Sequence, residues 1–360
     1  MKKIYLVILL IGSAITVEAQ SEPETLALTE GIDWEVFPIV TYDTDAGFGY
    51  GIKGYIRNPL AGNESYDLTL YNSTEGERWY RLQFSFPDYE ARHGTDYGYA
   101  LDLTADYDKW ISYYFYGIGI SSSYDNQKLF TREPLEFNII LNKTLTEDVI
   151  LQAGIRYKTI KYTNFPDSSL PAGYSYISKA DRLSLMIQGS YDSRNSIINP
   201  VSGTAVTAGI EFSPGYTFTN SSFAEARLTF QTYIQFIFPE LVFAGRLDIQ
   251  QLIGQNIPVQ FLLPIGGNLT LRGYSQDRFL DKGSALINAE LRFPIWWRFG
   301  GIAGIDAGRV FPSPSEFSFG SWKISPAAGL RFYMNNFVVR ADFGFSSETV
   351  GFYFNFGHLF

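Results

Sequence analysis

Hydrophobic and polar residues alternate with a period of two along most of the chain, in segments separated by turn residues. Segment 284–295 shows the pattern clearly, because Asn288, Glu290 and Arg292 alternate with alanine, isoleucine, leucine and phenylalanine. Successive side chains of a β-strand point to opposite faces, so this period predicts strands. The predicted strands number sixteen and lie at approximately 34–43, 46–57, 64–73, 77–86, 97–108, 131–141, 148–161, 180–192, 203–213, 223–236, 239–251, 284–295, 299–310, 322–334, 337–346 and 350–360.

These strands fit the wall of a transmembrane barrel better than a soluble β-sandwich. A sandwich gives the same alternation, because it buries its apolar face and solvates the other. Many strands of about ten residues or more, with aromatic residues near their ends, are typical of an outer-membrane barrel. The tryptophans near predicted strand ends are Trp110, Trp296, Trp297 and Trp322. The predicted fold is therefore an all-β, antiparallel transmembrane barrel of about 16 strands.

The composition supports a membrane barrel and disfavours other classes. Aromatic residues make up 17% of the chain, whereas a net charge of −9 argues against nucleic-acid binding. The chain has no cysteine, and His93 and His358 are its two histidines. We therefore expect no enzyme activity, no metal and no cofactor. A membrane-embedded hydrolase stays open as an alternative, although no acid–base constellation marks His358 as a catalytic base.

The N-terminal residues predict export. Lys2 and Lys3 precede an apolar stretch, which ends in the small-residue sequence Val-Glu-Ala at 17–19. This arrangement predicts a signal peptide at 1–19. Residues 20–33 are then a short periplasmic leader, because a folded domain needs roughly 50 residues or more. Residues 34–360 are expected to form one barrel domain, since dividing a barrel would expose its strand edges.

One long connection, 252–283, carries the sequence PIGGNLTLRGYSQDRF and is expected to fold back into the barrel lumen. Its glycines allow positive φ angles and close packing against a wall. Arg272 can anchor such a loop on a carboxylate, and the candidates are Asp306 and Glu290. Gly304 and Gly308 flank Asp306 and leave room for a second backbone. The alternative is a solvated loop arginine.

Four pieces of the chain together resemble the barrel of the BamA/TamA outer-membrane assembly factor superfamily, also described as the bacterial surface antigen type. They are the Leu-Arg-Gly-Tyr sequence at 271–274, Gly-Ile-Asp-Ala-Gly at 304–308, the charged turn at 191–203, and a last strand ending in phenylalanine. Gly304 stands where the family usually has phenylalanine. The resemblance implies a loop-to-barrel tether and a periplasmic turn motif. The tether residues are Arg272, Gly273, Tyr274, Asp306, Gly308 and Glu290, and the turn residues are Asp192, Arg194, Pro200 and Gly203.

Barrel closure requires the first and last strands to pair, because lipid cannot satisfy an open edge. Pro38 lacks an N–H, and glycines weaken the last strand, so we expect this seam to be the weakest ladder. The predicted seam residues are Pro38, Phe356 and Phe360. Phe356, His358 and Phe360 are also predicted to lie on the outward face of the last strand.

The resemblance implies a function in inserting or translocating proteins or lipids at the outer membrane of a Gram-negative bacterium. The expected branch is one with the barrel alone, without the periplasmic POTRA repeats that capture client chains. Its expected partners are the outer-membrane bilayer and either client outer-membrane proteins or a periplasmic protein that recruits them. The alternative function is a passive pore or a structural barrel. The oligomeric state is left open.

Overall fold

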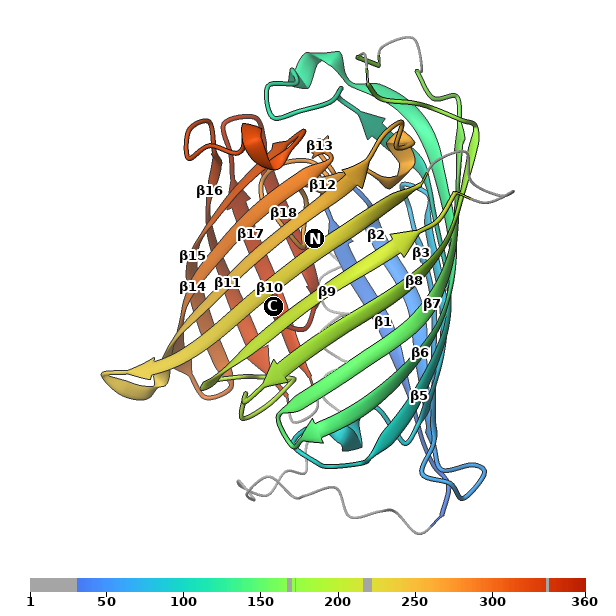
Figure 1. The fold of residues 1–360 in the computed structure, drawn as a ribbon. Coiled ribbons are helices and arrows are strands. Elements are labelled where there is room, and N and C mark those ends of the chain that lie inside the picture. The colour runs from blue at the N-terminus through green and yellow to red at the C-terminus, as the bar shows by residue number, and fades with distance from the viewer. Residues whose placement is uncertain (1–30, 167–169, 172, 216–221, 335–336) are drawn as a thin grey trace. The chain divides into compact units, whose positions relative to one another are not determined.

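Sixteen antiparallel strands close into a barrel, which confirms the predicted fold class (Figure 1). The structure is a computed structural model and describes residues 31–166, 170, 171, 173–215, 222–334 and 337–360. The predicted signal peptide and most of the predicted leader lie outside the described residues. No helix in these ranges is long and apolar enough to cross a bilayer.

The barrel strands lie close to the predicted ones. They are β1 (Asp33–Asp43), β2 (Gly47–Arg57), β3 (Ser65–Ser73), β4 (Glu77–Phe86), β5 (Tyr99–Phe115), β6 (Lys128–Thr146), β7 (Val149–Thr163), β8 (Lys179–Asp192), β9 (Gly203–Ser213), β10 (Phe223–Phe236), β11 (Phe238–Gly254), β14 (Gly283–Trp296), β15 (Phe299–Phe311), β16 (Lys323–Tyr333), β17 (Val338–Phe345) and β18 (Val350–Phe356). Each pairs with its neighbours in sequence, with two exceptions: β11 pairs directly with β14, and β1 pairs with β18 to close the barrel. The short strands β12 (Leu263–Ile265) and β13 (Phe279–Asp281) form a separate two-stranded sheet between them. The 3₁₀ turns are η1 (Glu90–Arg92), η2 (Tyr124–Asn126), η4 (Val259–Phe261) and η5 (Pro314–Glu316).

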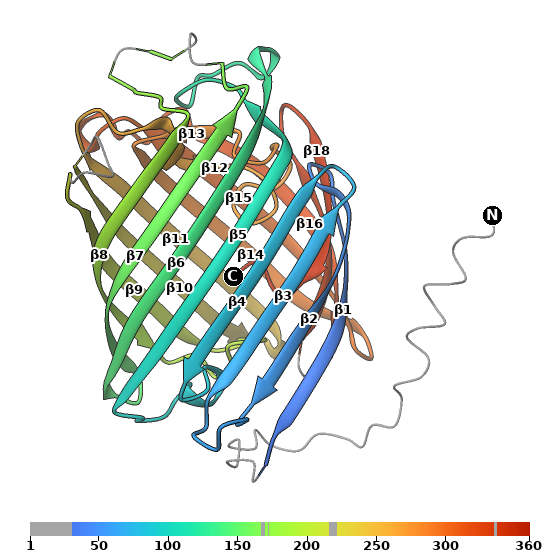
Figure 2. The same ribbon diagram turned by 90° about the vertical axis from the view of Figure 1, so that its right-hand side faces the viewer.

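The two faces of the wall separate polar from apolar side chains as the alternation predicts. In β14, Glu290 is 1% exposed and faces inward, whereas Ile287 is 42% exposed. Ile187 and Ile210, from β8 and β9, are more than 60% exposed on the outer surface. An apolar outer band around a polar interior suits a barrel whose wall contacts lipid. The strands are strongly tilted (Figure 2), as closure into a barrel requires.

Strands β5 and β6 extend well beyond the ranges predicted from the sequence. Their register shifts between Trp110 and Tyr113, which marks a bulge. A bulge puts one extra residue into a strand and breaks the period-two pattern, so the alternation could not show the continuation. Beyond the bulge, Tyr113 and Phe115 join a buried aromatic cluster with Phe130 near the long connections.

The last strand is shorter than predicted, and its C-terminal residues do not face outward. Strand β18 ends at Phe356, and Gly357 turns the chain with a φ of 80°. His358 then contacts Asn199 through a hydrogen bond of 2.9 Å between Nε2 and Oδ1. The Phe360 ring packs against Tyr233 of β10, with 6.4 Å between centroids. The prediction of an outward-facing strand to residue 360 was therefore wrong, because a glycine at positive φ redirects the backbone.

The seam between the first and last strands is a short ladder. Strand β1 pairs with β18 only through Tyr42 with Phe354 and Asp43 with Tyr353, whereas the β1–β2 ladder has 11 residue pairs. Pro38 lies opposite Ile52 of β2 and has no partner in β18. The ladder already stops at Tyr42 with Phe354, two residues before β18 ends. Pro38 would face residue 358, beyond that strand, so a missing proline N–H is not what shortens the seam. In the same way, Phe356 pairs with β17 rather than β1, and Phe360 lies outside the seam.

Candidate functional site: a loop held inside the barrel

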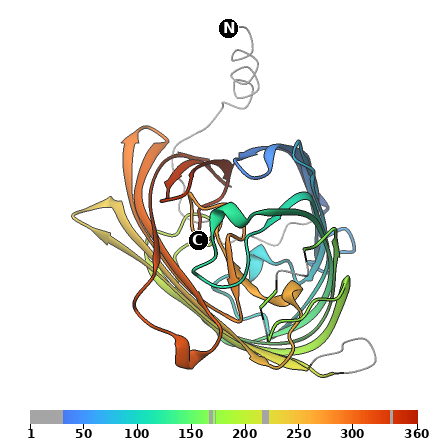
Figure 3. The ribbon, with the colours of Figure 1, turned by 90° about the horizontal axis from the view of Figure 1, so that it is seen from above.

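The connection between β11 and β14 runs through the inside of the barrel (Figure 3). Gly266, Gly267 and Gly273 have φ angles of 132°, 85° and 88°, which side-chain-bearing residues rarely adopt. At Gly273 the loop backbone also meets the wall. A Cβ atom added to Gly273 would lie 2.7 Å from the carbonyl carbon of Gly344 in β17. A loop and a strand touch here backbone to backbone, as the loop glycines predicted.

Arg272 is completely buried and contacts three carboxylates. Its Nε and Nη2 donate to the two oxygens of Asp306 at 2.8 and 2.9 Å, and its backbone N–H donates to Asp306 at 3.1 Å. Its Nη1 donates to Glu290 at 2.8 Å and to Asp342 at 3.1 Å. Both partners considered from the sequence are therefore bound at once. Asp342 of β17 is a third partner that the sequence reasoning missed.

Further arginines of the wall surround the same carboxylates. Arg292 of β14 lies 3.2 Å from Glu290. Arg331 of β16 and Arg340 of β17 both bind Asp342. Four guanidinium groups and three carboxylates, all less than 3% exposed, therefore form one network. Removing one member of such a network leaves an uncompensated buried charge, which is strongly destabilising.

The network also determines the charge state of the loop arginine. Burial alone lowers the pKa of an arginine, since it disfavours the charged form. Here the carboxylates of Asp306, Glu290 and Asp342 outweigh that effect and raise the pKa of Arg272 above its ordinary value. The guanidinium is thus fixed as a cation, and its planar donors match the bidentate geometry of Asp306.

Wall residues also bind the loop backbone at the Arg272 carbonyl and at Gly273. The Gly273 N–H donates to Tyr353 Oη of β18 at 3.0 Å, and the Gly273 carbonyl accepts from Ser346 Oγ at 2.8 Å. The hydroxyl of Ser325 in β16 donates to the Arg272 carbonyl. The alternation of the predicted strands indicates that these polar groups face the lumen. Nothing in the sequence distinguishes them from other lumenal residues as partners of the loop.

Tyr274 and Gly308 contribute mainly by packing. Tyr274 is 2% exposed, packs edge-on against Phe279 with 5.4 Å between ring centroids, and has its Oη 3.3 Å from Ser347 Oγ. A Cβ atom at Gly308 would lie 2.8 Å from Cδ1 of Ile265. The glycine therefore leaves room for Ile265 of the loop, and a side chain there would require the isoleucine to shift.

A second loop arginine, Arg278, forms another anchor that the sequence reasoning missed. It is fully buried, and its Nε and Nη2 donate to Glu348 at 2.6 and 2.9 Å. It also donates to Ser122 in the connection between β5 and β6. The loop is thus attached to the wall at one point and to the outer connections at another.

The predicted turn motif joins β8 to β9 at the opposite end of the barrel. Arg194 binds Asp192 through Nε at 2.9 Å and Nη2 at 2.6 Å. Gly203 has a φ of 101°, and a Cβ there would lie 2.3 Å from the Ser193 carbonyl oxygen. Pro200 is also buried. The structure therefore brings Asp192, Arg194 and Gly203 together in a turn that also contains Pro200, and among the described residues no hydrogen bond or ion pair joins them to the loop network.

The site offers charge and hydrogen bonding rather than an evident reaction centre. In the described part of the chain, no three histidine, aspartate or glutamate side chains are grouped as a metal site would require. His358 contacts Asn199 and the ring of Tyr333, whose centroid is 6.0 Å away. The arrangement holds a polypeptide segment inside a barrel.

Comparisons with known proteins agree with this architecture. Residues 60–360 match the family model described as the Omp85 superfamily domain. No curated protein matches the chain. BamA from Haemophilus ducreyi lacking POTRA domains 1–3 has a similar structure, with a TM-score of 0.65, 13% identity, and coverage of 90% of this chain and 70% of that chain.

Two CdiB structures are also similar. The one from Acinetobacter baumannii has a TM-score of 0.57, 15% identity, and coverage of 91% of this chain and 66% of that chain. The one from Escherichia coli has a TM-score of 0.61, 13% identity, and coverage of 90% and 62%. This chain thus spans less than two thirds of the length of either CdiB chain. At these identities the likeness concerns the fold, and the family assignment comes from the domain match over most of the chain. The resemblance inferred from the four motifs is confirmed: the chain belongs to the Omp85 superfamily.

Proposed function

We propose that this protein is an integral barrel of the outer membrane of a Gram-negative bacterium and inserts or translocates protein or lipid substrates there. The observation that carries the proposal is the seam, in which β1 and β18 share two residue pairs. BamA and CdiB, which have the same fold, make a role with client proteins the leading hypothesis. The partners we propose are the bilayer and a client polypeptide, delivered directly or by a periplasmic protein.

The short seam supports this role because it leaves most of one edge of β1 without a partner strand. Residues 33–41 of β1 are paired with β2 but have no β18 partner within the described chain. Unpaired backbone groups are costly in lipid, and an exposed strand edge is a template for an incoming strand. A client strand could add to β1 by backbone hydrogen bonding, as in other cases of β-augmentation. Opening the two remaining pairs, together with the hydrogen bonds between Thr44 and the Phe352 backbone next to them, would then create a lateral exit.

A disulfide across the seam tests the proposal. Because the chain has no cysteine, Tyr42→Cys with Phe354→Cys creates one defined pair at facing positions. Facing residues of antiparallel strands lie within the range that a disulfide can bridge. The matched control is Leu70→Cys with Tyr80→Cys, which cross-links the complete β3–β4 ladder. Both proteins are reconstituted in vesicles, and folding of a urea-unfolded outer-membrane barrel is followed by its gel mobility.

We expect the reduced seam variant and both forms of the control to accelerate client folding, and the oxidised seam variant to be inactive. Reduction should restore its activity. If the oxidised seam variant works as well as the control, lateral opening is not the mechanism and a passive or structural barrel explains the chain better. Absence of acceleration by the wild type would count against insertion of this class of client.

A further inference from the structure

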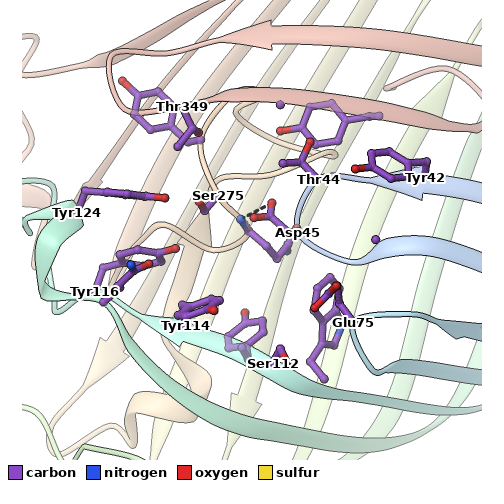
Figure 4. Close-up of a pocket in the computed structure, with 18 residues that line it drawn as sticks. Tyr42, Thr44, Asp45, Glu75, Ser112, Tyr114, Tyr116, Tyr124, Ser275 and Thr349 are labelled. Atoms are coloured by element: carbon purple, nitrogen blue, oxygen red, sulfur yellow. Dashed lines mark hydrogen bonds between the residues drawn. The ribbon is translucent and has the colours of Figure 1, made fainter.

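A cavity of about 340 Å³ lies at the end of the barrel that carries the long connections (Figure 4). It lies between the β1–β2 turn, the end of β5, the loop segment 274–276 and the start of β18. Figure 4 shows Tyr114, Tyr116 and Tyr124 along one side, Tyr42 on the other, and Asp45 between them. This volume lies at the lower end of the range of small-molecule sites.

The lining combines aromatic rings with carboxylates and contains no basic side chain. One tryptophan and seven tyrosines line the cavity, and its two charged residues are Asp45 and Glu75. Hydroxyl groups of serine and threonine supply the remaining polar surface. Such a lining repels anions, because both charged groups are negative and the negative faces of aromatic rings add to them.

The carboxylates of this cavity lack the arginine partners that are abundant deeper in the barrel. Asp45 Oδ2 accepts from the Gln276 backbone N–H at 2.8 Å. In the described ranges, no lysine, arginine or histidine nitrogen lies within 4.0 Å of Asp45 or Glu75. By contrast, Arg272 alone contacts three carboxylates. Burying a carboxylate is costly unless a cation pairs with it, so a bound cation would stabilise the half-buried Asp45.

Two further observations indicate which charge the cavity favours. Burial, together with the carboxylates of Asp43 and Asp277, raises the pKa of Asp45 to about 7. A bound cation would relieve this repulsion. The chain also places one cation on the neighbouring rings, since the Arg278 guanidinium lies 4.6 Å from the Tyr116 centroid and 5.8 Å from that of Tyr124. That guanidinium is neutralised by Glu348, so it does not neutralise Asp45.

We propose that this cavity binds a small, water-soluble organic cation, with an ammonium group against Asp45 and an apolar body between the tyrosines. The aromatic walls supply cation–π attraction, and the carboxylate supplies the counter-charge. The ligand contacts the end of β1 through Tyr42 and Thr44, and β18 through Tyr353. A bound ligand would therefore bridge β1 and β18 at the end of the seam where these two strands are paired.

Isothermal titration of the full barrel in an uncharged maltoside detergent tests the proposal with choline as the probe. The matched ligand is its carbon analogue, in which a neutral carbon replaces the quaternary nitrogen. Asp45→Asn removes the charge and keeps an oxygen for the Gln276 N–H, and Tyr124→Leu removes one ring. Asp125→Asn is the control, because Asp125 is exposed in the same outer connection and does not line the cavity.

Choline should bind the wild type and the Asp125 variant alike, and the carbon analogue should bind about ten-fold more weakly or not at all. Both cavity variants should lose affinity for choline by a similar factor, while their heat-modifiable gel mobility shows that they are folded. Three results would each overturn the proposal: equal binding of choline and its analogue, unchanged affinity in both cavity variants, or no choline binding up to about 50 mM. None of them bears on client insertion, which is measured separately.

Discussion

Replacing Arg272 with alanine should free the lumenal loop from the wall. Asp306 makes its only ion pair within the described residues with this arginine, and it would retain two neutral donors, the Asn288 amide at 2.7 Å and the backbone N–H of residue 272 at 3.1 Å. Glu290 and Asp342 would keep other arginines. Leaving one buried carboxylate without its cation costs about 3–5 kcal/mol. Because all these groups are shielded from water, little of that cost is screened.

The expected loss of stability in the loop can be measured as an increase in loop opening. Cleavage of the loop by added trypsin on whole cells proceeds through transient opening, and a change of about 3 kcal/mol raises the open population roughly a hundred-fold. The wild-type loop should resist cleavage, and the alanine variant should be cut at residues 278 and 282. Arg309→Ala is the control, since among the described residues Arg309 donates only to the carbonyls of Gly320 and Glu316. Its protection should equal that of the wild type.

Two further variants separate an ion-pair effect from a packing effect. Arg272→Ala combined with Asp306→Ala removes the stranded charge, so the double variant should be less destabilised than the sum of the single variants. Exchanging the charges of these two residues should fail, because an acidic side chain at 272 would face Glu290 and Asp342. A wild-type loop that trypsin cuts readily, or an Arg272→Ala loop as resistant as the wild type, would refute this account of the network.

Three other changes have defined outcomes. Arg278→Ala should expose the outer part of the loop to trypsin with a smaller effect than loss of the wall network, because its partner Glu348 is 14% exposed. Gly344→Ala should loosen the loop, since its Cβ would lie 2.5 Å from the loop backbone, whereas Gly54→Ala, with nothing within 4 Å, should not. The raised pKa of Asp45 predicts that its contribution to stability is present below about pH 4 and is lost as pH rises through about 7, because the folded state holds the proton more tightly. Thermal gel-shift curves of Asp45→Asn should therefore depend less on pH than those of the wild type.

The strands and the loop anchor could be predicted because each leaves a local signal. Period-two alternation depends only on which face of a strand meets lipid, so it located all sixteen barrel strands. An arginine between glycines in a long connection suggested an inward loop with an acidic partner. The simultaneous binding of Asp306, Glu290 and Asp342 by Arg272 could not be predicted, because it depends on barrel curvature, which brings β14, β15 and β17 around one point.

The structure differs from the remaining sequence predictions where a local pattern is interrupted. The bulge near Trp110 concealed the extension of β5, and the positive φ of Gly357 redirected a segment whose alternation suggested a continuing strand. Glycine is compatible with a strand and with a turn, so the sequence alone did not distinguish the two. The consequence was a wrong position for His358 and Phe360.

The inward tail prevents the seam from lengthening beyond the end of β18 at Phe356. To extend the β1–β18 ladder beyond Phe356, residues 357–360 would have to leave the lumen, where the Phe360 carbonyl accepts from Arg292 at 3.2 Å. The Arg292 and Arg246 guanidinium groups also lie 5.6 and 5.1 Å from the Phe360 ring. Contacts of this kind contribute about 1–3 kcal/mol each. An unpaired backbone group in lipid costs several kcal/mol. Leaving residues 33–41 of β1 without a partner in β18 therefore costs more free energy than the tail contacts contribute. An incoming strand would satisfy that edge while the tail stays in the lumen, and client pairing would not require the tail contacts to break.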